Sequence, residues 1–86
     1  MGTNDHEARG DVLYEAKGTV ERMSVRLALG QVLDYGRYVQ GVELAVLLPG
    51  MPAADLVELL KSYQIGCVVE DNPGQFTDVT GLGRCP

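Results

Sequence analysis

Hydrophobic and polar residues along the first half of the chain predict a strand followed by a helix. Val12 to Lys17 alternates between two faces, as a strand does, and Gly18 ends it. Thr19 is a suitable N-cap for the helix that follows, and Gly36 suits its end. The apolar stripe of this helix recurs at helical spacing and consists of Val25, Ala28, Leu29, Val32 and Leu33.

The second half of the chain predicts another strand, a helix and a third strand. Leu44 to Leu48 is a continuous apolar run, which is typical of a strand covered on both faces in a parallel sheet. Pro52 fits the first turn of a second helix. Its buried stripe is Leu56, Leu59, Leu60 and Tyr63. Ile65 to Val69 then reads as a short strand.

The element order is therefore β-α-β-α-β, which predicts an α/β fold. Right-handed crossovers would give a mostly parallel three-stranded sheet with two packed helices. Residues 1–10, which include His6, are expected to be a flexible or truncated N-terminus. Residues 71–86 are expected to be a poorly ordered C-terminal tail. The predicted domain thus spans residues 11–70.

Length and composition limit the class of protein. The chain of 86 residues is enough for one small domain. No apolar run approaches the roughly 20 residues that a membrane helix needs, and the polar start is not a signal peptide. We therefore expect a cytoplasmic protein with no membrane partner. Cys67 and Cys85 lack zinc-site spacing and are expected to be a core residue and a loose thiol.

The net charge of −5 argues against a surface that binds nucleic acid on all sides. The distribution of charge is more informative than the sum. Residues 17–37 hold four basic and two acidic residues, whereas acidic residues are in excess on both sides of this segment. The basic segment is also the part of the chain that carries the candidate chemistry.

Glu15 and Lys17 are the first candidate functional pair. Two residues apart on a strand, they project from the same face, and the Ala16 carbonyl lies between them. Oxygen ligands of this kind suit Mg²⁺, or Mn²⁺, and such a metal assists phosphodiester hydrolysis. The lysine would position or deprotonate the attacking water, or stabilise the charge of the pentacovalent state.

Gln31 and Tyr35 are four residues apart and lie on one face of the predicted helix. Their amide and phenol groups need polar partners, and metal-bound water, the scissile phosphate or the DNA backbone would serve. Thr19, at the helix start, offers free amides beside Lys17 as an anion site. Arg22 and Arg26 are candidates for holding a second phosphate.

The segments Tyr14-Glu-Ala-Lys-Gly18 and Gln31-x-x-x-Tyr35, followed by the buried run Leu44-Ala-Val-Leu-Leu-Pro49, resemble the PD-(D/E)xK nuclease superfamily. The closest likeness is to its QxxxY, RecB-like branch and to nuclease segments of bacterial restriction-type proteins. The resemblance implies a restriction-endonuclease-like fold and Mg²⁺-dependent cleavage of DNA. It also implies that Glu15, Lys17, Gln31 and Tyr35 are catalytic.

One departure from the family concerns its first metal ligand. The family places an Asp on an earlier strand, antiparallel to the ExK strand, and the chain is expected to start too late to contain that strand. Asp5 is the best stand-in, and Asp11 is a poorer one. The implied metal ligands are then Glu15, the Ala16 carbonyl and Asp5. A homodimer or a larger parent protein would complete the sheet.

Each candidate also has an ordinary structural interpretation. Glu15 and Lys17 can be a solvated pair on an exposed strand, Gln31 and Tyr35 a simple helix flank, and the two arginines a solvated face. Three functions follow: a metal-dependent DNA nuclease in restriction or repair, an inactive remnant or structural module of the same fold, and a DNA-binding module that does not cut.

Overall fold

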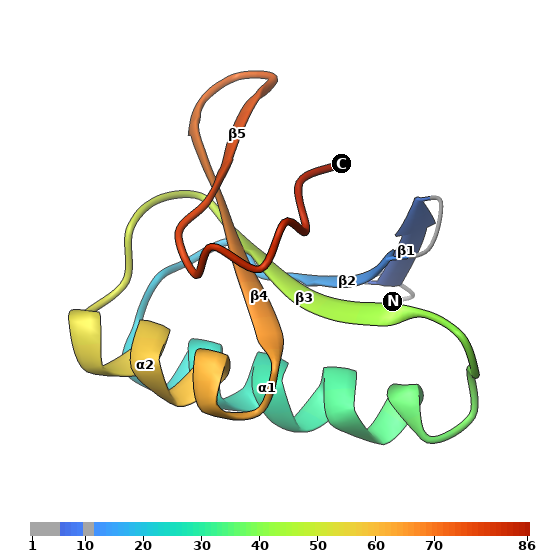
Figure 1. Ribbon diagram of the computed structural model, residues 1–86. Helices are drawn as coiled ribbons and strands as arrows, with labels where there is room; N and C mark the ends of the chain where they lie inside the picture. The colour runs from blue at the N-terminus through green and yellow to red at the C-terminus, as the bar shows by residue number, and fades with distance from the viewer. Residues whose placement is uncertain (1–5, 10–11) are drawn as a thin grey trace.

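The computed structural model describes residues 6–9 and 12–86, with side chains from residue 12 onward. Two helices lie beneath one continuous sheet (Figure 1). In chain order the elements are β1 (His6–Arg9), β2 (Val12–Ala16), α1 (Arg22–Gly36), β3 (Glu43–Leu48), α2 (Ala54–Ser62), β4 (Ile65–Asn72) and β5 (Gln75–Asp78).

The sheet has five strands in the order β1-β2-β3-β4-β5. Its centre is parallel, with Leu13 opposite Leu44 and Leu44 opposite Ile65. β1 and β5 run antiparallel to β2 and β4 at the two edges. The predicted α/β class and the three parallel strands are confirmed. The expectation of a mostly parallel three-stranded sheet is wrong for the whole sheet, which is mixed.

The edge strands escaped prediction because they are short and polar. β1 has the sequence His-Glu-Ala-Arg, and β5 has the sequence Gln-Phe-Thr-Asp with three of its four residues exposed. Strands of this kind bury little apolar surface, so their hydrophobic pattern carries almost no signal. His6 therefore belongs to β1 and not to an N-terminal tail.

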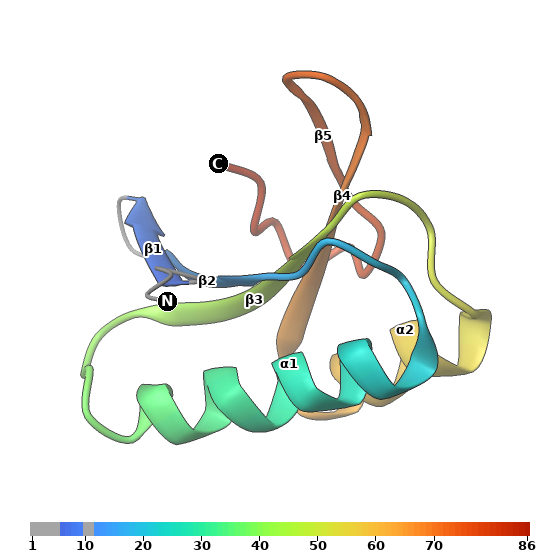
Figure 2. The same cartoon turned by 180° about the vertical axis from the view of Figure 1, so that it is seen from behind.

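Both helices pack on the same face of the sheet (Figures 1 and 2). α1 contacts β2 and β3, whereas α2 contacts β4. The larger core cluster lies between these layers and includes Val25, Val32, Val46, Leu56, Leu60 and Cys67, all nearly or fully buried. Burial raises the pKa of the Cys67 thiol to about 11, which keeps it protonated and confirms its role as a core residue.

α1 begins at Arg22, three residues later than its predicted cap. The Thr19 hydroxyl instead accepts a hydrogen bond from the Glu21 amide at 3.1 Å. A hydroxyl that binds the backbone two residues on stabilises a turn and not a helix start. The helix ends at Gly36, one residue beyond the expected position. None of the helices in the described ranges is long and apolar enough to cross a membrane.

The C-terminal segment, residues 80–86, lies over the opposite face of the sheet, with Thr80 and Arg84 buried there (Figure 1). Arg84 is 6% exposed there, and its Nη1 donates to the carbonyl oxygens of Leu44 at 2.9 Å and Gln64 at 3.1 Å. The Arg84 Nε lies 3.3 Å from a Glu43 carboxylate oxygen. The Tyr14 hydroxyl donates in turn to the Arg84 carbonyl oxygen. Through its side chain and its backbone carbonyl, Arg84 thus joins this segment to β2, to β3 and to Gln64, the residue preceding β4.

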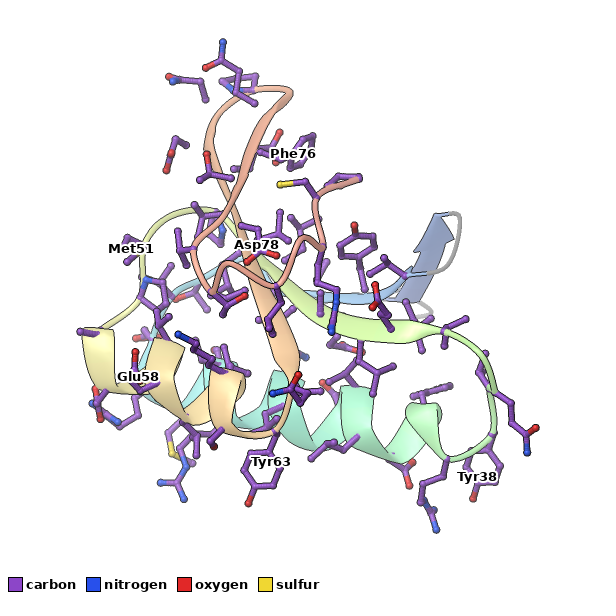
Figure 3. All side chains as sticks on the ribbon, viewed as in Figure 1. Tyr38, Met51, Glu58, Tyr63, Phe76 and Asp78 are labelled. Atoms are coloured by element: carbon purple, nitrogen blue, oxygen red, sulfur yellow. The ribbon has the colours of Figure 1, made fainter. Side chains whose placement is uncertain are left out.

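Asp78 organises the turn that leads into this segment. Its carboxylate accepts hydrogen bonds from the Thr80 amide at 2.8 Å, the Thr80 hydroxyl and the Arg84 amide at 2.6 Å. Figure 3 shows Asp78 where β5 gives way to the C-terminal segment. Residues 71–86 therefore contain β5 and a bonded segment with buried Thr80 and Arg84, in contrast to the poorly ordered tail that the sequence suggested.

Gly66 gives a test of this packing. A methyl group at Gly66 would lie 2.5 Å from Cγ and 2.8 Å from Cβ of Arg84. Gly66→Ala is expected to lower the free energy of unfolding by about 1–3 kcal/mol, because overpacking must displace the segment. Chemical denaturation measures the change. Gly50→Ala is the matched control, since nothing lies within 4 Å of its new methyl group, and an equal loss in both variants would contradict this packing.

Asp78 predicts a dependence of stability on pH. Burial alone would raise its pKa, but the hydrogen bonds from Thr80, Arg84 and Gly81 outweigh burial and lower it. A lowered folded-state pKa gives stability that is present above the unfolded pKa of about 3.9 and is lost as pH falls through the folded value.

Asp78→Asn should therefore reduce the free energy of unfolding at pH 7 by about 1–3 kcal/mol, because it leaves donors unpaired. The difference from the parent should shrink as the pH is lowered below about 4. Urea titrations at pH 7 and pH 3 measure it, with the exposed Asp71→Asn as the control. A difference that is the same at both pH values would show that the carboxylate charge is unimportant.

Candidate functional site

β1 supplies a strand antiparallel to β2 beside the Glu-x-Lys sequence. His6 occupies the register position opposite Glu15, and Arg9 the position opposite Val12. The expectation that the chain starts too late to contain such a strand is therefore wrong. The sequence did hold a signal for it, since the two-residue connection Gly10-Asp11 is a common hairpin composition.

Glu15 lies on the face of the sheet that the helices cover. Its register partner on β3, Val46, belongs to the core between sheet and helices, and residues paired across a sheet share a face. Glu15 is 0% exposed. The alternative of a solvated pair on an exposed strand is therefore wrong. A carboxylate at such a depth requires compensating charge or hydrogen bonds.

Lys17 provides part of that compensation. Its Nζ lies 3.6 Å from the Glu15 Oε2, and its side chain is 15% exposed. Both residues take part in at least one further interaction. The spacing that the sequence predicted, with a carboxylate and an ammonium on the same strand face, is present as a close pair.

The Ala16 backbone is directed toward β1. The Lys17 amide donates to the Leu47 carbonyl at 3.0 Å, so the polar backbone groups of Lys17 point to β3. Successive residues of a strand direct these groups to alternate neighbours, and those of Ala16 consequently point the other way. Its carbonyl lies one residue beyond the last described pair of β1 and β2, which joins His6 to Glu15.

Gln31 and Tyr35 lie on the flank of α1 that is farther from α2. Arg22 marks the opposite flank, because it contacts Asp55 of α2. Gln31 is nine residues, or about two and a half turns, after Arg22 and so points the other way. α1 contacts β2 and β3 while α2 contacts β4, so this flank lies on the β2 side of the molecule. The acid–lysine pair and the amide–phenol pair therefore share one side of the sheet.

The Gln31 side chain contributes a buried acceptor. Its Oε1 is buried and accepts no hydrogen bond within the described part of the chain. An amide oxygen left in this way costs about 1–3 kcal/mol, and such groups often mark a site that takes a ligand or an ion. Tyr35 is 46% exposed and takes part in a further interaction.

The candidate phosphate ligands lie elsewhere. Arg22 makes two hydrogen bonds to the Asp55 carboxylate, at 2.8 and 2.9 Å. This pairing raises the pKa of Arg22 and lowers that of Asp55. Arg26, one turn along, lies on the same side of α1 as Arg22. The structure therefore does not bring these two arginines together with Glu15, and the Thr19 hydroxyl is used by the local turn.

The structure describes two of the three candidate metal ligands, Glu15 and the Ala16 carbonyl. Asp5, one of the three, lies outside the described residues. Among the side chains that the structure describes, those of residues 12–86, there is no group of three His, Cys, Asp or Glu that could hold a metal. No pocket forms over the site in the same range. The donors present, the Glu15 carboxylate, the Ala16 carbonyl and the Gln31 amide oxygen, are hard oxygen ligands of the type that Mg²⁺ prefers.

No family model, curated protein or solved structure matches the chain. The functional conclusion therefore depends on the residues and their geometry alone.

Proposed function

We propose that this chain is a metal-dependent DNA nuclease domain of the PD-(D/E)xK type that hydrolyses phosphodiester bonds in the cytoplasm, in restriction or repair. The observation that carries the proposal is the fully buried Glu15 with the Lys17 ammonium 3.6 Å away. Two further observations support it: β1 lies antiparallel beside β2, and the flank of α1 that carries Gln31 and Tyr35 lies on the same side of the sheet as Glu15.

A buried acid–lysine pair is unlike an ordinary structural feature. Removing two charges from water costs more than most such pairs return, so an apolar pair of similar volume is often as stable or more stable. The core between sheet and helices is otherwise apolar, with Val46 and Leu48 on the neighbouring strand. Charged groups kept in such a setting are candidates for chemistry.

In this proposal Glu15, the Ala16 carbonyl and Asp5 hold Mg²⁺ or Mn²⁺. When bound, the metal supplies Lewis-acid neutralisation of the phosphate charge. Lys17 donates hydrogen bonds to the phosphate oxygens as negative charge grows on them. The Gln31 amide oxygen accepts a hydrogen bond from the attacking water and orients it, and the Tyr35 hydroxyl donates a hydrogen bond to the phosphate. The water oxygen forms the new bond to phosphorus as the ester P–O bond breaks. The attacking water releases its proton to solvent, and the leaving oxygen takes up a proton from solvent and departs as a hydroxyl group.

The distribution of paired charges weighs against a module that only binds DNA. Arg22, Arg37 and Arg84 each form an ion pair with a carboxylate of the same chain. Of the basic side chains from residue 12 onward, Arg26 and Lys61 form no ion pair with an acidic residue of the described part. Two separate cations are a small footprint for sequence-independent binding to phosphates.

The competing proposal is a catalytically inactive module of the same fold. It is favoured by one observation, that Glu15 is not joined by two other acidic, histidine or cysteine ligands within the described residues. Asp5 decides between the two proposals, because it is the residue that would complete the ligand set.

Cleavage of plasmid DNA in Mg²⁺ or Mn²⁺ tests the proposed chemistry. Lys17→Ala should reduce the rate at least about 100-fold, since it removes charge stabilisation from the transition state. Gln31→Ala should leave folding intact, because its carbonyl oxygen has no hydrogen bond to lose, and should slow cleavage about tenfold or more. Lys61→Ala, an exposed lysine of α2, is the control. Equal rates for Lys17→Ala and the parent would refute the assignment.

A metal-binding assay distinguishes the role of the proposed ligand residues from the role of Lys17. Titration with Mn²⁺, followed by calorimetry or electron paramagnetic resonance, should show a site that Glu15→Gln and Asp5→Asn each weaken at least about tenfold. Lys17→Ala should still bind the metal, because an ammonium is no ligand. Circular dichroism checks that each variant is folded. A parent chain that binds no Mn²⁺ would favour the inactive module.

A further inference from the structure

The side of α1 that faces away from the sheet is partly apolar and uncovered. Met23 is 73% exposed and Leu27 is 56% exposed. With Gly30 and Asp34 they follow a spacing of four, three and four residues, which places them in one row along the helix. We call these four residues the outer face of α1. Figure 2 shows that no described element lies below this side of the helix.

Gly30 is unexplained by packing within the chain. It sits in the middle of α1, and a methyl group built on it meets nothing within 4 Å. Glycine inside a helix destabilises it by about 0.5–1 kcal/mol relative to alanine. The missing side chain allows another backbone or a large side chain to approach the helix closely.

We propose that a second copy of the chain docks on the outer face of α1, with the two helices antiparallel about a two-fold axis. The axis places Leu27 of each copy over Gly30 of the other, so that the leucine fills the space above the glycine. Met23 of each copy then lies beside Asp34 of the other. A two-fold contact of this kind is self-complementary and closes as a dimer. This inference goes beyond the proposed function and does not depend on it.

Charge complementarity selects the antiparallel arrangement. Arg26 borders the outer face and makes no ion pair in the described part of the chain. The Asp34 side chain is 59% exposed, and one of its two carboxylate oxygens forms an ion pair with Arg37. In the antiparallel arrangement Arg26 of one copy approaches the Asp34 end of the other, and two equivalent ion pairs form. A parallel arrangement would set Arg26 against Arg26.

The size of the contact sets its strength. Tyr38 and Tyr63 are 73% and 54% exposed, and both point away from the sheet on the helical side (Figure 3). They can widen the contact at its edges. A pairing of single helices still buries less than the roughly 800 Å² per partner of a standard interface. The dimer is therefore weak, and its population depends on concentration.

Sedimentation equilibrium from about 5 to 500 µM tests the proposal, a range that brackets the micromolar affinities typical of a small interface. The parent should pass from monomer to dimer within this range. Gly30→Lys should remain a monomer at the highest concentration, with a melting temperature equal to or above that of the parent, because lysine is the better helix former. Ala54→Lys on α2, which adds the same charge at an exposed helical site, should dimerise like the parent.

A charge exchange tests the antiparallel arrangement itself. Arg26→Asp should weaken the dimer at least about threefold, and adding Asp34→Arg in the same chain should restore it, since each new pair forms between copies. A parent that stays monomeric overturns the proposal. A dimer that survives Gly30→Lys overturns it as well, because another surface, such as the β5 edge, then makes the contact.

Discussion

The buried carboxylate of Glu15 is the constraint on which the candidate site depends. It lies on the helix-covered face of β2, where the neighbouring residue on β3 is Val46 and the surroundings are apolar. A charge in such a place is tolerated only with a nearby partner, and the Lys17 ammonium lies 3.6 Å away. The pair places opposite charges at the edge of the core, where solvent reaches the lysine, whose side chain is 15% exposed.

β2 is held from both faces by different parts of the chain. Glu15 lies on the face of the sheet that the helices cover, while the preceding residue, Tyr14, points to the opposite face and donates to the Arg84 carbonyl. Arg84 in turn binds the Leu44 carbonyl on β3 and the Gln64 carbonyl just before β4, and its side chain fills the space above Gly66. A segment at the far end of the sequence thereby restrains the strand that carries the candidate chemistry. Under the proposed function, this second layer of the fold would supply part of the rigidity that the site requires.

Sequence patterns captured the features that depend on neighbours along the chain. The two helices, the three parallel strands and the common face of Glu15 and Lys17 follow from periods of 3.6 and 2 residues. β1 and β5 could not be found in this way, because a polar edge strand buries too little to leave a pattern. The partners of Arg22 and Arg84 were equally hidden. Arg22 meets Asp55 across 33 residues and Arg84 meets Leu44 across 40, so only the packed fold reveals that both guanidinium groups are used within the chain.

Because Arg22, Arg37 and Arg84 form ion pairs within the chain, they contribute little to the attraction of DNA. Free cations are few on the described surface, and the net charge is −5, so long-range attraction of a polyanion is weak. Under the proposed function, affinity would come from short-range contacts at the site, where Lys17 and the metal ligands converge. Two copies joined through α1 would hold two such sites in one particle and raise the effective concentration of the second once the first is engaged. The proposed dimer would therefore compensate for weak binding of DNA at each single site.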